Sequence, residues 1–270
     1  MILFPPCKIN LGLHVLCKRD DGYHAIETCM YPIPIYDILE IIPSKEFEFT
    51  SSGIPIPGEA SSNLCVKAFQ ILQEKFSLPN VKIHLHKVIP MGGGLGGGSS
   101  DGSYVLLGLN ELFNLNLSNS ELQQFAAKLG SDCPFFIENT AQIATGRGEI
   151  LEPFPLDLKG YFLKIINLGI HVSTQEAYAG VAFYKGDINV KTILENNSIE
   201  NYKSTLFNSF EHSIFTKHPI LSELKNVLYD EGATYAAMTG SGSTLFAIYK
   251  EKPSDTEFNH PIQFEEIVEL

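Results

Sequence analysis

The segment of this chain best suited to chemistry is a run of glycines. Residues 92–98 hold six glycines and one leucine, and Ser99 and Ser100 follow. Glycine loses more backbone entropy on ordering than any other residue, so the run cannot form a stable regular element. It lies between an alternating segment at 81–88 and an apolar segment at 102–113, which we expect to be a strand and a helix. Bare backbone N–H groups at the start of that helix would form an anion site.

Three other interpretations of the glycine run are less favoured. A flexible linker would lie between domains and carry Ser or Pro throughout, whereas this run interrupts a strand–helix unit. A Walker A loop needs a Gly-Lys-Ser/Thr string, which is missing here. The G-x-G-x-x-G spacing of a dinucleotide-binding loop can be found among so many glycines by chance, so a match to it carries little weight. The hydroxyls of Ser99 and Ser100 could reach a phosphate oxygen or Mg²⁺. A shorter motif at 239–243 is either a second N–H-rich turn or an ordinary hairpin turn.

The elements that must position these motifs form two mixed halves that meet near residue 155. We expect strands at 8–17, 24–35, 37–42, 81–88, 161–166, 235–238 and 244–249. We expect helices at 63–76, 102–113, 118–129, 174–183 and 220–231. Ser118, with Glu121 three residues later, matches a capping box. The polar, Asn-rich stretch 185–203 is expected to be a surface excursion, and the chain from 252 a loop with a short last strand.

The composition narrows the classes of function. The chain has 270 residues, 44% of them apolar, which is enough for a substantial core. Its 31 acidic and 19 basic residues leave a net charge of −12, which argues against a general nucleic-acid binder. The five cysteines are odd in number and lack C-x-x-C spacing, so reduced cytosolic thiols are expected rather than disulfides or zinc. We expect neither a secretory signal nor a membrane span.

Four segments, in this order, resemble the GHMP kinases, the superfamily of galactokinase and of homoserine, mevalonate and phosphomevalonate kinases. Residues 91–101 resemble the glycine motif of that family, 129–136 (LGSDCPFF) its catalytic-aspartate segment and 239–243 its third motif. The strings KINL at 8–11 and RDDGYH at 19–24 are similar to the N-terminal motif of those members that phosphorylate a methylerythritol linked to cytidine diphosphate. The resemblance covers nearly the whole chain.

The resemblance implies an α+β fold of the two-domain GHMP kinase type. A ribosomal-protein-like α/β domain would occupy residues 1–155 and a ferredoxin-like α+β domain residues 156–270, with the active site in the cleft between them. ATP and Mg²⁺ would be the cofactors, and the partner would be a small-molecule substrate rather than nucleic acid or a membrane. The protein would be cytoplasmic, and its oligomeric state stays open. The alternatives are a GHMP kinase for another small alcohol, such as homoserine or mevalonate, and a non-catalytic nucleotide-binding relative.

The resemblance also assigns roles to single residues. Asp132 corresponds to the catalytic base, which would accept the hydroxyl proton, and Lys8 to the lysine beside it. The implied substrate contacts are Asn10, Tyr23, His24 and, more loosely, Tyr178, the last three at the cytosine. The implied ATP contacts are Asn63, Pro90, Met91, Gly92, Gly93, Gly94, Leu95, Gly96, Gly97, Gly98, Ser99, Ser100, Gly240, Ser241 and Gly242. Ser100 is also the implied metal ligand, and Asp101 and Glu149 are either Mg²⁺ partners or structural polar residues.

Overall fold

The computed structural model describes residues 1–186 and 189–270 and divides the chain into two compact units. Each unit is assembled from separate stretches of sequence. The first comprises residues 1–8, 34–91 and 96–140, and the second comprises residues 9–33, 92–95 and 141–270. The expected division of the chain at residue 155 stays a prediction.

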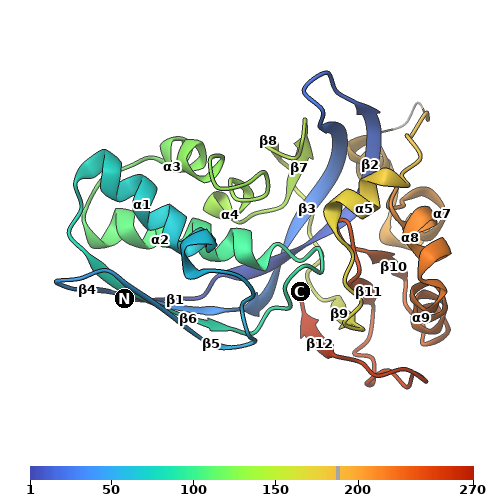
Figure 1. The fold of residues 1–270 in the computed structure, drawn as a ribbon. Helices are drawn as coiled ribbons and strands as arrows, with labels where there is room; N and C mark the ends of the chain where they lie inside the picture. Colours follow the sequence, from blue (N-terminus) through green and yellow to red (C-terminus); the bar gives the residue numbers. More distant parts are fainter. Residues whose placement is uncertain (187–188) are drawn as a thin grey trace. The chain divides into compact units, whose positions relative to one another are not determined.

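The first unit is a sheet with helices packed on one face. Its strands lie in the order β1 (Ile2–Leu3), β4 (Ile38–Pro43), β6 (Val81–Lys87) and β5 (Glu48–Gly53), with β5 parallel to β6 and the other pairs antiparallel. The helices are η1 (Ala60–Ser62), α1 (Leu64–Phe76), α2 (Gly97–Leu112), α3 (Asn119–Ala126) and α4 (Phe135–Glu138). In Figure 1, α1 and α2 run side by side along this sheet. Ile83 of β6, Leu72 of α1 and Leu106 of α2 belong to the core that they enclose.

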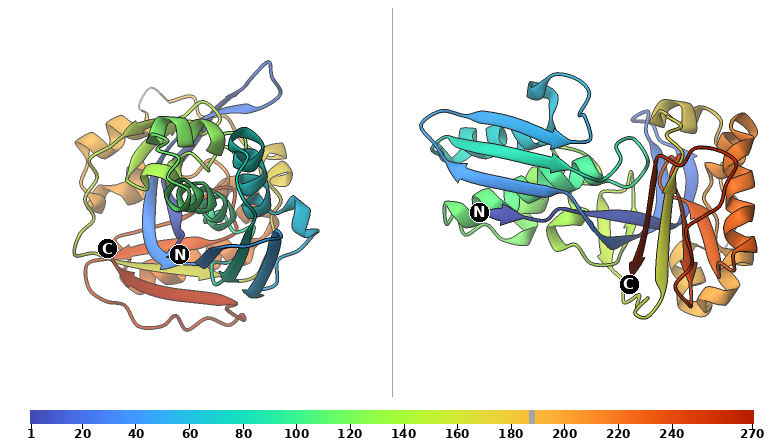
Figure 2. Two further views of the ribbon diagram at one scale, coloured as in Figure 1. Left: turned by 90° about the vertical axis from the view of Figure 1, so that its left-hand side faces the viewer. Right: turned by 90° about the horizontal axis from the view of Figure 1, so that it is seen from below.

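The second unit contains two further sheets. One has the order β10 (Tyr235–Met238), β11 (Leu245–Tyr249), β9 (Phe162–Asn167) and β12 (Phe264–Glu269), and all its pairs are antiparallel. The other has the order β2 (Pro6–Lys18), β3 (His24–Tyr36), β7 (Gln142–Thr145) and β8 (Ile150–Pro153), although residues 6–8 of β2 and 34–36 of β3 belong to the first unit. The helices are α5 (Thr174–Ala179), α6 (Val190–Asn196), η2 (Ile199–Asn201), α7 (Tyr202–Thr205), α8 (Glu211–Lys217) and α9 (Pro219–Asp230). Figure 2 shows α9 along one face of the first of these sheets, where its buried Leu221, Leu224 and Leu228 meet the core.

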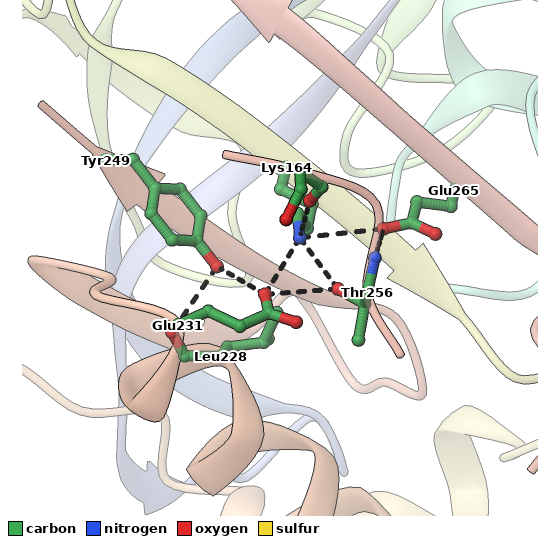
Figure 3. Close-up of polar contacts among 7 residues, drawn as sticks. Lys164, Leu228, Glu231, Tyr249, Thr256 and Glu265 are labelled. Carbon is green, nitrogen blue, oxygen red and sulfur yellow. Dashed lines mark hydrogen bonds and ion pairs between the residues drawn. The ribbon is translucent and has the colours of Figure 1, made fainter. Parts of the chain in front are cut away.

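A buried lysine ties the last strand of the chain to its sheet (Figure 3). Lys164 on β9 is fully buried, and its ammonium donates to Glu231 Oε2 at 2.8 Å, to Thr256 Oγ1 at 2.7 Å and to the carbonyl of Ser254 at 2.7 Å. Its Nζ also lies 3.6 Å from Glu265 Oε1 on β12. A buried charge needs such partners, and two of them, Ser254 and Thr256, lie in the loop before β12. Lys164 therefore holds this loop against β9.

The local signals in the sequence predicted most elements correctly. The seven expected strands are confirmed within one or two residues, and so are the helices that became α1 and α9. The capping box is also confirmed, because Ser118 Oγ accepts the N–H of Glu121 while the Glu121 carboxylate accepts that of Ser118. The helix expected at 174–183 ends at Ala179, where Gly180 follows as the C-cap.

Other expectations were wrong or incomplete. The surface excursion expected at 185–203 contains α6, whose Val190, Ile193 and Leu194 are buried at helical spacing; residues 187–188 lie outside the described ranges. Helix α2 begins at Gly97, five residues before the expected 102, and Gly97 packs closely against Ile89 and Lys87. Strands β1, β5, β7 and β8 and helices α4, α7 and α8 were missed, and so were the short 3₁₀ helices η1 and η2. Among the described residues, none of the helices has the length and apolar character that a bilayer crossing requires.

Candidate active site

Lys8 and Asp132 form an ion pair in the first unit. Lys8 lies on β2 and Asp132 in the turn before α4, and Lys8 Nζ is 3.5 Å from Asp132 Oδ2. The Lys8 side chain is 3% exposed, whereas that of Asp132 is 35% exposed. Buried Cys133 and Phe136 follow the aspartate and anchor its turn. Asp132 is therefore the member of the pair that a ligand can reach.

The N-terminus of α2 packs against this pair. Gly96, the N-cap of α2, has a φ of +71°, and a Cβ placed there would lie 2.9 Å from Phe136 Cζ and 3.1 Å from Lys8 Cγ. Any side chain there would therefore crowd both Phe136 and Lys8. The first amides of an α-helix have no intrahelical acceptor and carry the positive end of the helix dipole. The structure thus brings the predicted residues Lys8, Asp132 and Gly96 together.

A cavity of about 320 Å³ lies in the same unit. Three of the predicted ATP residues line it: Asn63, which also caps α1 by accepting the N–H of Cys65 at 2.8 Å, together with Met91 and Gly98. The other lining residues include apolar Phe49, Ile56, Pro57 and Leu64 and the polar Ser51, Glu59, Ser62, Lys87 and Asp101. The cavity therefore combines apolar walls with the first turn of α2.

Lys87 at the end of β6 was missed by the sequence analysis. Its ammonium is buried between two carboxylates, donating to Asp37 Oδ2 and, at 2.8 Å, to Asp101 Oδ2 on α2. Asp37 Oδ1 also accepts the backbone N–H groups of Val88 and Ile89, at 2.6 Å and 2.9 Å. Burial, opposed by the Lys87 charge, raises the pKa of Asp101 to about 7.

This buried trio of Lys87, Asp37 and Asp101 connects the segment that enters the glycine loop with the helix that leaves it. The sequence did hold a signal for it. Residues 81, 83 and 85 of β6 face the core, and the same alternation places Lys87 inward, where a cation requires acidic partners. Asp101 Oδ2 is thereby a structural partner of Lys87, while the buried Asp101 Oδ1 has no hydrogen-bond partner among the described residues.

Residues 92–95 of the glycine loop belong to the second unit, where they contact the motif at 239–243. The N–H of Thr244 donates to the carbonyl of Gly93 at 3.3 Å, and Thr239 Oγ1 donates to that of Gly94 at 3.2 Å. Gly94 has a φ of +81° and Gly240 a φ of +56°. A Cβ on Gly94 would overlap the carbonyl of Thr239, so the two motifs meet through main chain.

Asn10 supports this contact from β2. Its backbone N–H donates to Thr239 Oγ1 at 3.1 Å, and its Nδ2 donates to Thr28 Oγ1 at 3.0 Å. Its Oδ1 lies 3.3 Å from Thr239 Oγ1 and shares the one hydroxyl hydrogen of Thr239 with the carbonyl of Gly94. With only 2% of its surface exposed, Asn10 positions the 239–243 motif in this structure. Its contact with a substrate stays a prediction.

The residues predicted to hold a cytosine lie in the second unit. His24 stacks on Tyr178 with ring centroids 4.4 Å apart and planes 18° apart, and Tyr178 packs edge-on against Phe210. Tyr23 is 55% exposed, and the Arg147 guanidinium lies 4.8 Å from its ring centroid. Burial and the nearby Lys18 charge lower the pKa of His24, so its ring is neutral at pH 7 and presents one donor and one acceptor.

The oxygen ligands available for Mg²⁺ are sparse. Ser100 Oγ is buried beside the first turn of α2 and has no hydrogen-bond partner among the described residues, so it suits a hard cation or a phosphate oxygen. Glu149 instead accepts from the backbone N–H of Arg147 at 2.5 Å and from Arg147 Nε at 3.3 Å. Within residues 1–186 and 189–270, no three or more His, Cys, Asp or Glu side chains are placed so that they could hold one metal ion together. This set fits an ion that takes most of its ligands from phosphate and water.

Comparison with known proteins identifies the class. A model of the GHMP kinase N-terminal domain matches residues 63–139, and a model of the GHMP kinase C-terminal domain matches residues 182–259. The chain belongs to the GHMP kinase family, which confirms the expected α+β fold of two domains. A mevalonate kinase from Methanococcus jannaschii shares this fold with a TM-score of 0.65 at 14% identity, over 92% of this chain and 90% of its own.

More similar relatives carry one particular name. A protein of Cytophaga hutchinsonii named 4-diphosphocytidyl-2-C-methyl-D-erythritol kinase is 51% identical over 94% of each chain. A Bacteroides fragilis protein of the same name is 44% identical over 98% of this chain and 97% of its own. A crystal structure of 4-(cytidine 5'-diphospho)-2C-methyl-D-erythritol kinase matches with a TM-score of 0.80 at 32% identity, covering 92% of this chain and 90% of that one.

Proposed function

We propose that this protein is an ATP-dependent 4-diphosphocytidyl-2-C-methyl-D-erythritol kinase. It transfers the γ-phosphoryl group of ATP to the 2-hydroxyl of that substrate and releases ADP. The observation that carries the proposal is the Lys8–Asp132 pair packed against Gly96 at the start of α2. The names of the relatives, at high identity and coverage, favour this substrate over homoserine or mevalonate.

Asp132 acts as the base in this proposal. Its carboxylate is partly exposed, so it can accept the proton of the substrate hydroxyl while it orients the oxygen for in-line attack. The buried ammonium of Lys8 offsets the negative charge on the transferred group. A retained base beside its lysine argues against a non-catalytic nucleotide-binding relative.

The main chain holds ATP in this proposal. The amides of Gly97, Gly98 and Ser99 at the start of α2 face polyphosphate oxygens, and the cavity lined by Asn63 and Met91 takes the rest of the nucleotide. The remaining residues from Pro90 to Ser100, with Gly240, Ser241 and Gly242, complete the proposed ATP contacts. Backbone binding explains how a chain with a net charge of −12 holds an anion.

Ser100 is the proposed protein ligand of Mg²⁺. When bound, the ion neutralises charge on the phosphate oxygens of ATP and orients them. The chain supplies the buried Ser100 hydroxyl at the first turn of α2, and Lys8 provides the other positive charge.

Tyr23, His24 and Tyr178 are proposed to bind the cytosine, and Asn10 to bind the substrate nearby. An aromatic face stacks on a pyrimidine, and the neutral His24 ring matches the donors and acceptors of a base edge. The stacking of His24 on Tyr178 supports the proposal to the extent that it brings these two rings together.

Domain division and cellular location are further parts of the proposal. Residues 1–155 and 156–270 are proposed as the two domains, since the family matches at 63–139 and 182–259 fall on either side of that boundary. The five free cysteines favour the reducing cytoplasm, and the acidic composition disfavours nucleic acid as a partner.

A coupled assay of ADP release tests the function. We expect turnover with 4-diphosphocytidyl-2-C-methyl-D-erythritol and little with homoserine, mevalonate or galactose. A Tyr23→Ala, His24→Ala double variant should lose turnover of the cytidylyl substrate. Full activity of that variant, or equal turnover of another alcohol, would refute the proposed substrate.

A further inference from the structure

We propose that Arg147 is an additional substrate-binding residue, and that its guanidinium holds the diphosphate of the cytidylyl substrate. The inference rests on the proposed function, because it concerns the same substrate. Arg147 lies in the turn between β7 and β8, over the ring of Tyr23. The sequence analysis assigned it no role.

Local contacts fix Arg147 in place while leaving part of its guanidinium available. Glu149 accepts from its backbone N–H at 2.5 Å and from its Nε at 3.3 Å. The turn itself is tied to β3, because the N–H of Ile26 donates to the carbonyl of Gly146 at 2.8 Å. The two Nη groups make no hydrogen bond within residues 1–186 and 189–270, and the side chain is 36% exposed. Four N–H donors therefore remain for a ligand.

The chain has only two arginines, and both lie beside Tyr23. Arg19 donates its backbone N–H to the carbonyl of Tyr23, but its guanidinium is occupied by Asp21, with Nε 3.0 Å from Oδ2 and Nη2 2.9 Å from the same oxygen. Asp21 thus takes donors from two nitrogens of the Arg19 guanidinium, whereas Glu149 takes only the Nε donor of Arg147, so Arg147 has more donors left for a ligand. Lys18, whose charge acts on His24, is the neighbouring alternative, but an ammonium is a point charge without a planar fork.

The phosphates of a nucleoside diphosphate favour the Arg147 guanidinium over an ammonium group as their protein contact. A nucleoside diphosphate whose base packs against Tyr23 carries its phosphates within about one side-chain length of that ring. In a chain with a net charge of −12 those phosphates need a local cation, and a guanidinium meets two phosphate oxygens at once. Arg147 would therefore distinguish the diphosphate-linked substrate from a free nucleoside.

Calorimetric binding of CDP and of cytidine tests the proposal without requiring turnover. In Arg147→Gln, the preference for CDP over cytidine should fall about 10- to 100-fold, the range expected for hydrogen bonds to a charged group. Arg147→Lys should retain an intermediate preference, since it keeps the charge and loses the fork. The matched control Arg19→Gln removes one positive charge from the same region and should keep the wild-type preference.

Kinetics supply a second readout. Arg147→Gln should raise KM for the cytidylyl substrate and leave KM for ATP unchanged, and its melting temperature should match that of the wild type. The proposal would be overturned if Arg147→Gln kept the wild-type preference for CDP over cytidine, or if Lys18→Gln lost that preference instead. In either case, turnover by the wild type would still support the proposed kinase function. A wild type that binds neither CDP nor cytidine and does not phosphorylate the cytidylyl substrate would overturn both.

Discussion

Gly94 and Gly240 lie main chain against main chain in the second unit. A Cβ on Gly240 would come 2.9 Å from Gly94 Cα, and one on Gly94 would overlap the carbonyl of Thr239. Both residues have positive φ, which L side chains rarely adopt. Two glycine motifs far apart in the sequence are thus in contact because neither carries a side chain at this point.

Gly94→Ala should destabilise the protein by about 3 kcal/mol, because the methyl group meets both backbone strain and a steric clash. Gly160→Ala is the matched control: its φ is +86°, but a Cβ there would have nothing within 4 Å, so only about 1 kcal/mol of strain is expected. Urea unfolding of the two variants measures the difference. Equal losses would show that the contact between the motifs does not constrain Gly94.

Asp132→Asn should lower turnover about 10²–10⁴-fold, the contribution typical of a general base. The amide keeps the shape of the side chain but cannot take the hydroxyl proton. ATP binding, measured by calorimetry, should persist because the main chain of α2 is unchanged. Glu138→Gln, in the helix after Asp132, removes a charge nearby and should keep activity. Unchanged turnover in Asp132→Asn would rule out the proposed base.

Asp101 should make stability depend on pH in a definite direction. Its pKa is raised from 3.8 to about 7 by burial, so the folded state binds the proton more tightly than the unfolded chain does. Its contribution to the free energy of unfolding is therefore greatest below pH 4 and is lost as the pH rises through 7. The stability of the wild type relative to Asp101→Asn should fall between about pH 4 and 7.

Urea unfolding at several pH values measures this difference. The exposed Glu74 on α1 supplies a control in the same unit, since Glu74→Gln should show no such trend. A difference between wild type and Asp101→Asn that rises across this pH range would contradict the raised pKa.

Lys164→Met should cost about 3 kcal/mol of stability, because it leaves the carboxylates of Glu231 and Glu265 without their buried cation (Figure 3). Lys82→Met breaks the surface pair with Glu48, in which both side chains are about half exposed, and should cost less than about 1 kcal/mol. Thermal melts compare the two. Similar melting temperatures would mean that the network around Lys164 does not hold β12.

The sequence predicted helices and strands better than it predicted which side chains contact each other. Strand β6 was recognisable from its alternation and α9 from its helical spacing, since both are local patterns. Helix α6 was missed because its short apolar face lies within Asn-rich sequence, so composition masked the periodicity. Arg147 was missed for another reason: a lone arginine in a hairpin turn has no local signature, and only folding places it over Tyr23.

By itself the sequence determined the glycine loop between a strand and a helix, the order of the family motifs and the acidic charge of the chain. These are properties of composition and spacing, which exist before folding. Only the tertiary structure decided which groups meet: Lys87 contacts Asp37, 50 residues away, and Asp132, in the turn before α4, contacts Lys8 on β2. Such pairs depend on burial of distant segments against each other, because a cation removed from water is stable only where the fold supplies the opposite charge.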